Sequence, residues 1–571
     1  MVQTVWSVRE NKGRGAVSAP LTAGGATPPL QFSPWFLQLL ARRGLSSLEA
    51  IETFLHPTRE ELTNPFLMKG MREAVERIRR AEVSREKVLI HGDYDVDGVT
   101  GTALVSLALE KLGVAHETFL PERARDGYGV SREAIQRALL AGIRLLITVD
   151  CGISAREEIE EARQAGIGTI VLDHHQIPSG GLPPAEVILN PLQEGCAYPF
   201  KELSAGGLAF KLAQALLGPE AFQFFDLAAL STVADLAPLR EENRILVKEG
   251  LRQLSERKRT GIRALAQTAS LGSREIKTSH VGFVLGPRIN ASGRMSSAAT
   301  ALRLLLTRSE REAASLAQIL EEENRRRQQE ERRVVNEAIE EVERTVNFAR
   351  EQVLVVAREG WHAGVIGIVA SRLVERYHRP SLVIALKEGE GKGSGRSIRS
   401  FHLFKALEAA REFLLEFGGH EQAAGFSIER EKIPLFRKRL NEHSHAAYPA
   451  EIFLRSIDID LEITLEDLTP QFLRELERLE PFGVGNPKPV FLTRGLQVRV
   501  ISPRKTRGFS RPAVWVTDGK VTYEVVISER SGIQIDFEPG ARLDLVYTIG
   551  ARRWEGEVIL VLEARDAKRP S

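Results

Sequence analysis

Cysteine is scarce in this sequence. Only two of the 571 residues are cysteines, Cys151 and Cys196. Two cysteines are too few for a disulfide framework or for a zinc site built on cysteine sulfur. Any metal ligands of this chain must therefore be aspartate, glutamate and histidine side chains.

The sequence also lacks a long apolar run and an excess of either charge. The first twenty residues have no apolar centre of a signal peptide, and no segment reaches the length that crosses a membrane. We therefore expect a cytoplasmic protein without membrane contact. The 78 basic residues nearly balance the 76 acidic ones, so a polyanionic partner must be bound by a local basic patch.

What the chain does have is length for about three or four domains, at roughly 150 residues each. From residue 86 onward, short β-branched runs such as KVLI and GTIVL alternate with amphipathic helical segments. This alternation predicts an α/β fold with a parallel sheet. Ligands of such sheets bind beyond the carboxyl ends of the strands.

The pattern changes several times along the chain. Residues 309–347 contain no glycine or proline, and the stretch Asn324–Arg333 has no apolar residue, which predicts a solvent-exposed helix between domains. Short strands with turn signals near the end predict an OB-like β-barrel. We predict five regions: an N-terminal helical cap (1–85), a parallel-sheet domain (86–308), an interdomain helix (309–347), a second α/β domain (348–450) and the OB-like barrel (451–571).

One short stretch crowds carboxylates together. His91, Asp93, Asp95 and Asp97 directly follow a short apolar run. Carboxylates this close repel each other and raise one another's pKa unless a cation neutralises them, which indicates a metal site. An acidic turn whose aspartates cap a helix is the alternative, and this stretch alone does not decide between the two.

Further acidic and imidazole groups follow the next runs. Asp150 ends LLITVD, Asp173, His174 and His175 end TIVLDHH, and Asp235 lies on the later, helical segment ALSTVADLAPL. Together with the first cluster, these groups suffice for two divalent ions that share one bridging carboxylate. A set rich in oxygen, with histidine and without cysteine, favours Mn²⁺ or Mg²⁺ over structural Zn²⁺.

The motifs HGDYDVDG, TVDCG, LDHH and STVADLAPL, in this order, resemble the DHH phosphoesterase superfamily. Five further stretches are similar to its RecJ branch of single-strand-specific DNA exonucleases: PERARDGYGVS, GPRINASGRM, WHAGVIGIVASRL, GKGSGRSI and FGGHEQAAGF. The last three lie in what that family calls the DHHA1 domain. The similarity covers most of the chain from about residue 35 onward.

The resemblance implies a role for each matching acidic residue and histidine. It makes one metal site of His91, Asp95 and Asp150, and the other of Asp97, Asp150, His174 and Asp235, with Asp150 as the bridge. It assigns His175 and His420 to the substrate and Asp93 to the orientation of a ligand. For Asp93 and Asp173, simple loop capping is an equally good interpretation. Taken alone, His420 is an ordinary surface or core histidine.

The resemblance also implies contacts with DNA. Arg123, Ser394 and Arg396 would hold a terminal 5′ phosphate through charge-assisted bonds, and Arg288 and Asn290 would lie on the DNA backbone. The alternative for these loops is an ordinary turn with a solvated arginine. Arg504 and Arg507, beside aromatic residues of the barrel, have the chemistry that holds single strands. Tyr128 would stack on a base or pack against the protein.

The resulting expectation is a 5′→3′ exonuclease specific for single-stranded DNA. It would release 5′ mononucleotides by two-metal hydrolysis with Mn²⁺ or Mg²⁺ and act in DNA repair and recombination. We expect a monomer, with a single-strand-binding protein and a recombination helicase as candidate partners. The alternatives are a phosphodiesterase for short oligonucleotides or cyclic dinucleotides, and a non-catalytic replication scaffold. All six ligand positions are filled, which argues against the scaffold.

Overall fold

The structure is a computed structural model that describes residues 4–8, 32–122, 129–506, 509–527, 537–554 and 557–570. It divides into two compact units. The parallel-sheet unit comprises His56–Glu330 and Pro481–Pro487, and the mixed-sheet unit comprises Met1–Leu55, Glu331–Glu480 and Lys488–Ser571. No helix among the described residues combines the length and the apolarity needed to span a bilayer.

The parallel-sheet unit is built on five parallel strands in the order β3-β2-β4-β5-β6. These strands are β2 (Val88–Gly92), β3 (His116–Phe119), β4 (Leu145–Val149), β5 (Gly168–Leu172) and β6 (Val187–Leu189). The central strands β2 and β4 are buried throughout, which explains why their sequences are mostly apolar runs rather than alternating patterns. This confirms the parallel sheet predicted from the sequence.

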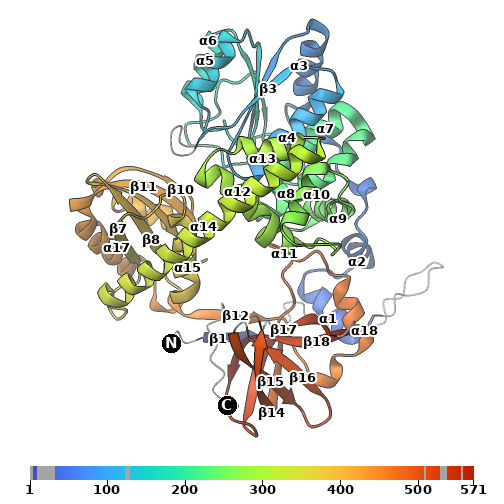
Figure 1. The fold of residues 1–571 in the computed structure, drawn as a ribbon, viewed down its shortest axis with the longest axis vertical. Helices are drawn as coiled ribbons and strands as arrows, with labels where there is room; N and C mark the ends of the chain where they lie inside the picture. Colours follow the sequence, from blue (N-terminus) through green and yellow to red (C-terminus); the bar gives the residue numbers. More distant parts are fainter. Residues whose placement is uncertain are drawn as a thin grey trace, which may run out of the picture. The chain divides into compact units, whose positions relative to one another are not determined.

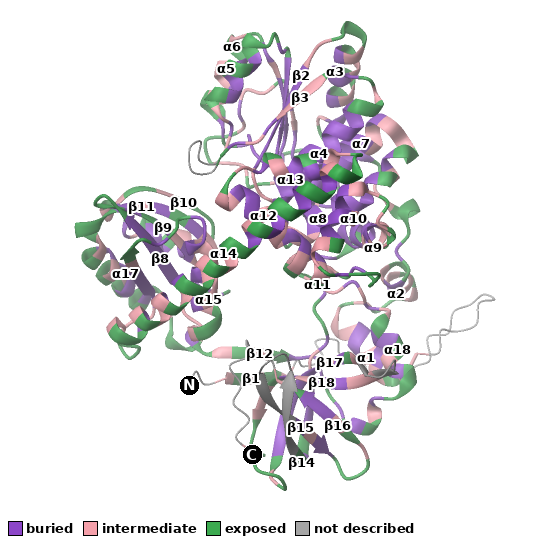
Figure 2. Ribbon diagram, in the orientation of Figure 1, coloured by how far each residue is buried: buried purple, intermediate pink, exposed green. Residues whose placement is uncertain are grey.

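Helices cover both faces of this sheet (Figure 1). The helices α5 (Arg132–Leu140) and α6 (Arg156–Gln164) pack on one face through Leu89, Leu146 and Val171. On the other face, Ile90 and Ile147 contact the core formed with α3, α4 and α7. These helices are α3 (Met71–Ser84), α4 (Val96–Lys111) and α7 (Ala205–Leu217). Helix α4 is buried along almost its whole length (Figure 2).

A helical subdomain follows the sheet along the chain. Its longer helices are α8 (Phe225–Ala234), α9 (Glu241–Glu256), α10 (Thr260–Thr268), α12 (Gly286–Met295) and α13 (Ala299–Leu306). The short helix α11 (Thr278–His280) runs into a π-helical turn, η4 (Val281–Leu285). Helix α8 packs between α4 and α9, so its C-terminal end is fixed relative to the sheet.

The long helix α14 (Glu310–Thr345) matches the predicted interdomain helix closely in extent, but its middle is not exposed on all sides. Asn324 is 1% exposed and Arg327 7%, although both lie in the stretch without apolar residues. Two guanidinium nitrogens of Arg327, Nε and Nη2, donate to Asn324 Oδ1 at 3.3 and 3.0 Å. Polar side chains can be buried here because they bond to one another, which the sequence pattern alone does not reveal.

The first part of the mixed-sheet unit is a five-stranded sheet in the order β10-β11-β9-β8-β7. Only β7 and β8 run parallel, and the other neighbours are antiparallel. The strands are β7 (Leu354–Glu359), β8 (Ser381–Lys387), β9 (Glu390–Arg396), β10 (Leu414–Gly419) and β11 (Ala423–Glu429). The helices α15 (Ile366–Tyr377), α16 (Leu403–Glu408) and α17 (Ile433–Ala447) pack against it.

The C-terminal part is a closed β-barrel, as the sequence predicts. Its strands are β14 (Phe491–Thr506), β15 (Phe509–Thr517), β16 (Thr522–Val526), β17 (Arg542–Trp554) and β18 (Glu557–Lys568). They pair in the order β14-β15-β16-β18-β17, and a further pairing of β14 with β17 closes the ring. The short strand β13 (Leu461–Glu462) pairs with β14, and α18 (Pro470–Glu477) precedes the barrel in the chain.

The region predicted as one helical cap is divided in the structure. Strand β1 (Thr4–Val8) pairs in parallel with β12 (Arg455–Ile459). The exposure of its side chains alternates along the sequence, as in a strand rather than a helix. Helix α1 (Pro34–Arg42) packs against α18, where Ser33 donates to the Glu475 carboxylate. Helix α2 (Leu48–Leu55) follows, and only α3 joins the parallel sheet.

Candidate metal centre

The carboxyl edge of the parallel sheet carries most of the candidate ligands. His91 lies in β2, Asp150 follows β4, and His174 and His175 follow β5. Asp235 lies directly after the last turn of α8. Since neighbouring parallel strands end at one edge, residues far apart in the sequence meet here, as the strand pattern predicts.

Asp95 and Asp97 begin helix α4, and both are held by backbone N–H groups. Asp95 Oδ1 accepts from the N–H groups of Asp97 and Gly98 at 2.9 and 3.1 Å, so Asp95 does cap the helix. Asp97 accepts from the N–H groups of Ala205 and Gly206, both at 2.8 Å. Capping and metal binding are therefore compatible at this loop, because each carboxylate has further lone pairs.

The sequence did not predict the set of hydrogen-bond donors that holds the Asp97 carboxylate, which we call the cradle of Asp97. It consists of the first turn of α7, with Ser204 as its N-cap, and of the Ser231 hydroxyl on α8, which donates to Asp97 Oδ1. Ser204 and Ser231 also bond to each other at 2.6 Å. The sequence LSAGG has the form of a helix N-terminus. Nothing in it indicates that the N–H groups of this terminus donate to a carboxylate about 100 residues away in the sequence.

The cluster raises the pKa of its own carboxylates. Burial, followed by the charge of Asp97 and the other aspartates, raises the pKa of Asp150 well above its ordinary value. Burial and the charge of Asp97 raise the pKa of Asp95. The same two causes raise the pKa of Asp235 to about 8. A bound cation would remove this repulsion, which is the electrostatic signature of a metal site.

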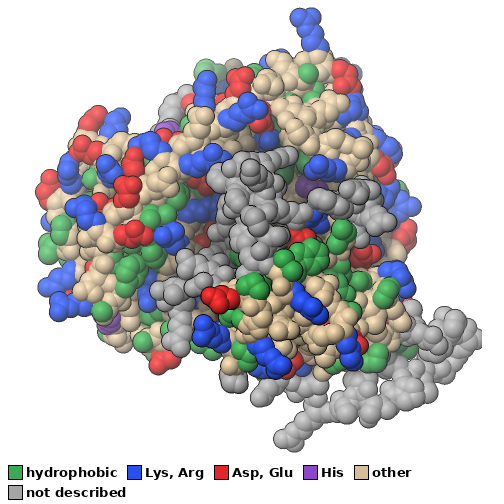
Figure 3. Space-filling model, turned by 60° about the horizontal axis from the view of Figure 1, so that its bottom comes forward, with side chains coloured by type: hydrophobic (Ala, Val, Ile, Leu, Met, Phe, Trp, Pro, Cys, Tyr) green, Lys and Arg blue, Asp and Glu red, His purple; other side chains and the backbone are tan. Residues whose placement is uncertain are grey.

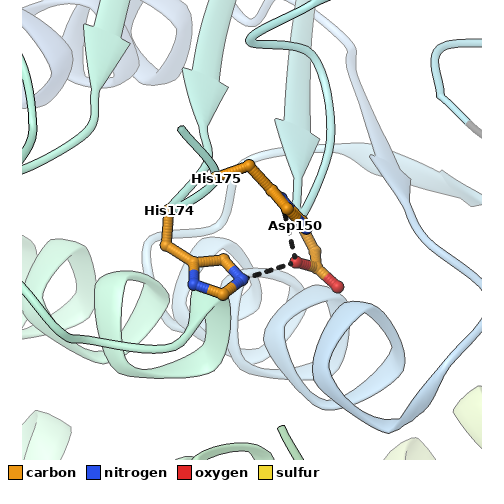
Figure 4. A group of neighbouring side chains, drawn as sticks. All are labelled: Asp150, His174 and His175. Carbon is orange, nitrogen blue, oxygen red and sulfur yellow. Dashed lines mark ion pairs between the residues drawn. The ribbon is translucent and has the colours of Figure 1, made fainter. Parts of the chain in front are cut away.

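His174 joins three of the carboxylates. Its Nε2 atom lies 3.2 Å from Asp150 Oδ1, 3.6 Å from Asp97 Oδ2 and 3.9 Å from Asp235 Oδ2. Figure 4 shows the imidazole directed at the Asp150 carboxylate. Burial lowers the pKa of His174, which favours the neutral imidazole that binds metals.

His175 differs from His174 because it forms a short hydrogen bond with the carboxylate of Asp173. Its Nδ1 atom lies 2.7 Å from Asp173 Oδ1. The same atom lies 3.9 Å from Asp150 Oδ1, an ion pair drawn in Figure 4. Burial acts to lower the pKa of His175, but the hydrogen bond and charge of Asp173 outweigh it and raise the pKa to about 9. Asp173 is itself fixed by the Ile153 N–H at 2.9 Å. His175 is therefore a cationic side chain at the rim of an acidic cluster.

Among the residues that the structure describes, three groups of ligand atoms lie close enough to hold a metal, each within 4.8 Å: Asp93, Asp95 and Asp150; Asp97, His174 and Asp235; Asp150, His174 and His175. Asp150 occurs in two of them, and its φ of 64° places it in the left-handed region. The second group matches the set predicted for one ion apart from the shared Asp150. These oxygen and imidazole donors fit Mn²⁺ or Mg²⁺.

The first of these groups consists of Asp93, Asp95 and Asp150, whereas the resemblance implied His91 in place of Asp93 as the ligand beside Asp95 and Asp150. In the structure, His91 Nε2 accepts from the Ser131 N–H at 3.1 Å, and its Nδ1 atom lies 3.6 Å from Cys151 Sγ. The assignments of His91 as a ligand and of Asp93 as an orienting group therefore stay predictions.

The residues expected on the DNA backbone are engaged within the protein. Asn290 Oδ1 accepts from the Val96 N–H at 3.0 Å and so fixes the first turn of α4. Arg288 pairs with Glu321 of α14 at 2.7 Å. Asn290 thus joins the helical subdomain to α4, and Arg288 joins it to α14, while the contact of both residues with DNA stays a prediction.

Ser394, Arg396 and His420 belong to the mixed-sheet unit. Arg396 Nη1 lies 3.2 Å from Ser394 Oγ on strand β9. A Cβ atom on Gly367 of α15 would come within about 3 Å of both side chains, so this glycine leaves room for them. His420 is exposed, and its Nδ1 atom accepts from the Gln422 N–H at 3.3 Å. Arg123, Tyr128 and Arg507, and the side chain of Arg504, lie outside the described residues.

Family models match three parts of the chain. The DHH family N-terminal domain matches residues 87–237, the DHHA1 domain 350–445 and the RecJ OB domain 459–566. These ranges fall inside the regions 86–308, 348–450 and 451–571 that we propose as domains.

Relatives and solved structures match almost the whole chain. The single-stranded-DNA-specific exonuclease RecJ of Bacillus subtilis is 38% identical over 546 residues, which cover 95% of this chain and 69% of that protein. RecJ of Escherichia coli is 35% identical, covering 85% of this chain and 88% of the relative. The crystal structure of Thermus thermophilus RecJ in complex with Mn²⁺ matches with a TM-score of 0.81 and 32% identity, over 95% of this chain and 76% of that one. A complex of the same protein with Mg²⁺ matches with a TM-score of 0.75 and 30% identity.

Proposed function

This chain belongs to the RecJ family, and from that premise we propose that it is a metal-dependent exonuclease that degrades single-stranded DNA from its 5′ end and releases 5′ mononucleotides. The family membership rests on the identity to RecJ proteins over 95% of the chain. The cluster of aspartates and histidines at the sheet edge carries the chemical part of the proposal. Related structures hold Mn²⁺ and Mg²⁺, and the donors present here suit both ions.

The chemistry that a pair of divalent ions supplies is an activated water and neutralisation of charge on the phosphodiester. Asp150 takes part in two of the three ligand groups, which suits a bridging carboxylate. Asp97 and His174 are held in place before any ion binds, Asp97 by the N–H groups of α7 and His174 by neighbouring carboxylates. Such preorganisation lowers the cost of assembling the site.

His175 has a role that does not require it to bind a metal. The hydrogen bond and charge of Asp173 raise the pKa of His175 in the metal-free protein, which favours a cationic ring whose charge is the opposite of the phosphate's. Asp173 holds Nδ1 of the ring, which leaves Nε2 to donate to a substrate oxygen. We propose that His175 binds the scissile phosphate and that Asp173 is its positioning residue.

The 5′ polarity rests on the pair of Ser394 and Arg396, which offers a hydroxyl and a guanidinium side by side. These groups suit the doubly charged terminal phosphate. Degradation of strands with a label at either end, in Mn²⁺, in Mg²⁺ and in chelator, tests the proposal. We expect a 5′ label to appear at once as a mononucleotide, with no product in chelator. Early loss of a 3′ label, or cleavage without metal, would refute it.

We further propose that the protein acts as a cytoplasmic monomer in DNA repair and recombination, alongside a single-strand-binding protein and a recombination helicase. The single-strand specificity in the names of its relatives supports this setting, because a helicase produces single strands by unwinding duplex DNA and a single-strand-binding protein coats them. Sedimentation of the pure protein and co-precipitation with each partner test it. A stable dimer, or failure to bind either partner, would contradict the respective part.

A further inference from the structure

A short loop of the C-terminal half of the chain belongs to the parallel-sheet unit. Residues Pro481–Pro487, with the sequence PFGVGNP, group with His56–Glu330, whereas the residues on either side group with the mixed-sheet unit. The loop has its own structure, because the N–H and C=O groups of Gly483 and Asn486 bond to each other at 2.9 and 3.2 Å. Asn486 is 2% exposed, and its side chain donates to the Pro481 carbonyl.

The loop binds the segment that directly follows Asp235. The Leu239 N–H donates to the Val484 carbonyl at 2.7 Å. A Cβ atom on Gly483 would lie 2.6 Å from Leu239 Cδ1, and one on Gly485 would lie 2.9 Å from Pro238 Cβ. A second attachment joins the Thr278 hydroxyl to the Phe482 carbonyl at 2.7 Å. The loop thus approaches residues 238 and 239 as closely as glycine permits.

The segment that the loop binds is strained. Leu236, next to Asp235, has a φ of 61°, and Glu241 has a φ of 45°. Leucine and glutamate rarely adopt this left-handed conformation, and they keep it only where surrounding contacts impose it. Leu236 is 68% exposed, so its side chain gains little from burial that would offset the strain. The conformation must therefore be imposed by the backbone contacts on either side of Leu236.

Those contacts come from two places. On the near side, the Ala237 N–H donates to the Thr232 carbonyl at 3.1 Å and closes the end of α8. On the far side, the loop bonds to Leu239 and packs against Pro238, whose carbonyl also accepts from the side chain of Asn243 at 3.1 Å. Without the loop, the chain after Asp235 could relax to an unstrained conformation, and the Asp235 carboxylate would lose its fixed place beside His174 and Asp97.

We propose that the loop Pro481–Pro487 is a positioning element for the metal ligand Asp235, so that the C-terminal half of the chain completes a metal site in the parallel-sheet unit. This inference rests on the proposed function, since it takes Asp235 as a ligand. It adds that residues about 250 positions away in the sequence set the affinity for the ion held by Asp97, His174 and Asp235.

Gly485→Ala tests the proposal with a matched control. Alanine at this position is disfavoured by a φ of +75° and would collide with Pro238. Gly495 has a φ of +66°, but a Cβ atom added there would meet nothing within 4 Å, so Gly495→Ala introduces similar backbone strain without touching the loop. Mn²⁺ binding, followed by the spectroscopic signal of the free ion, is measured for both variants and for the wild-type protein. We expect Gly485→Ala to weaken binding of the ion held by Asp97, His174 and Asp235 about tenfold and Gly495→Ala to change it less than twofold.

A rescue distinguishes positioning from general damage. Glycine adopts a positive φ without strain, so Leu236→Gly removes the need for the loop to impose that conformation. We expect Leu236→Gly combined with Gly485→Ala to recover Mn²⁺ affinity to within about threefold of wild type. Failure of the rescue, or equal Mn²⁺ affinity in Gly485→Ala and Gly495→Ala, would overturn the proposal. If Gly485→Ala does not fold, Thr278→Val decides, because it removes only the bond to Phe482 and should weaken binding about threefold; unchanged binding would again overturn the proposal.

The same titration separates this inference from the proposed function. If the wild-type protein binds no Mn²⁺, and Asp235→Asn is indistinguishable from it, the metal assignment itself is wrong. If the wild-type protein binds two ions and Asp235→Asn loses one, but the loop variants bind as wild type does, only the positioning role is wrong.

Discussion

The two α/β sheets of this chain carry different functional groups at the ends of their strands. In the parallel sheet, strand ends bring Asp150 and the residues around Asp95 and Asp173 to one edge, where the carboxylates raise one another's pKa. In the mixed sheet, β9 ends at Arg396, which is opposite Ala423 of β11. A parallel sheet gathers several strand ends at one edge and can concentrate one charge there, whereas antiparallel neighbours alternate in direction. We infer that one sheet binds cations and the other binds the anionic end of the substrate.

The face of the molecule shown in Figure 3 gives no hint of this division. On the face shown in Figure 3, basic and acidic side chains are interspersed, in keeping with a net charge of only +2. In the proposed function, metal binding and binding of the strand end depend on a few buried or half-buried groups in each sheet. Variants that act on one sheet at a time should separate the two roles.

The largest effect is expected at the cation-binding sheet. Asp150→Ala removes the carboxylate that belongs to two ligand groups and should lower the rate of nucleotide release by at least about 10³-fold in Mn²⁺. Binding of single-stranded DNA should persist, because the loss falls on the transition state. Asp518→Ala, at an exposed turn of the barrel, is the control for removal of an aspartate. An Asp150→Ala protein with near-normal activity would show that the bridge is elsewhere.

The mixed sheet should produce a smaller and more selective effect. If Arg396 holds a terminal phosphate, Arg396→Ala removes a charge-assisted bond of about 1.5–3 kcal/mol and should slow degradation of 5′-phosphorylated strands roughly 10- to 100-fold. Strands with a 5′ hydroxyl lack the group that the arginine binds, so their degradation should slow about threefold or less. Arg430→Ala serves as the control, since Arg430 is exposed and paired with Glu359 in the same sheet region. Equal losses on both substrates would assign Arg396 another role.

Some features of this molecule could be predicted from the sequence, and others could not. The strand-end pattern and the motifs were enough to predict the parallel sheet, the barrel and the ligand cluster, because alternation and spacing are local properties. The cradle of Asp97 and the buried pair of Asn324 and Arg327 depend on contacts between distant segments. Strand β1 was missed because five alternating residues carry little signal beside a glycine-rich stretch. The loop Pro481–Pro487 reads as an ordinary turn in the sequence, and only its packing against residues 238 and 239 gives it a role.

An effect of intermediate size is expected on the stability of the metal-free protein as the pH changes. In the folded state Asp235 has a pKa of about 8, above its ordinary value of 3.8. Between these values the folded protein binds more protons than the unfolded chain, so this group makes the metal-free protein less stable as the pH rises from about 4 to 8. Bound Mn²⁺ removes the effect, because the carboxylate is then favoured in its charged form. The increase in melting temperature caused by Mn²⁺ should therefore grow from about pH 5.5 to about pH 8.

Melting curves in chelator and in Mn²⁺, at several pH values, test this expectation. Asp235→Asn provides the comparison, because asparagine does not titrate and should flatten the dependence on pH. A stabilisation by Mn²⁺ that is the same at both ends of this pH range would contradict the shifted pKa.

The smallest effect is expected at the barrel, which contributes to binding rather than to chemistry. Removal of Arg504, Lys505 and Arg507 together should weaken binding of long single strands several-fold and leave cleavage of a dinucleotide unchanged. Each phosphate contact on a single strand contributes about 0.7 to the slope of log affinity against log salt, so three lost contacts should lower that slope by about 2. Arg79, Arg163 and Arg252 are paired with glutamates on their own helices, and their joint replacement removes the same charge without touching the barrel. Substitution is a cleaner test than truncation after residue 450, because truncation would also remove Pro481–Pro487 and with it a support of Asp235. If both triple variants change the slope equally, the barrel is no special site for DNA, and strand binding must come from the two α/β sheets.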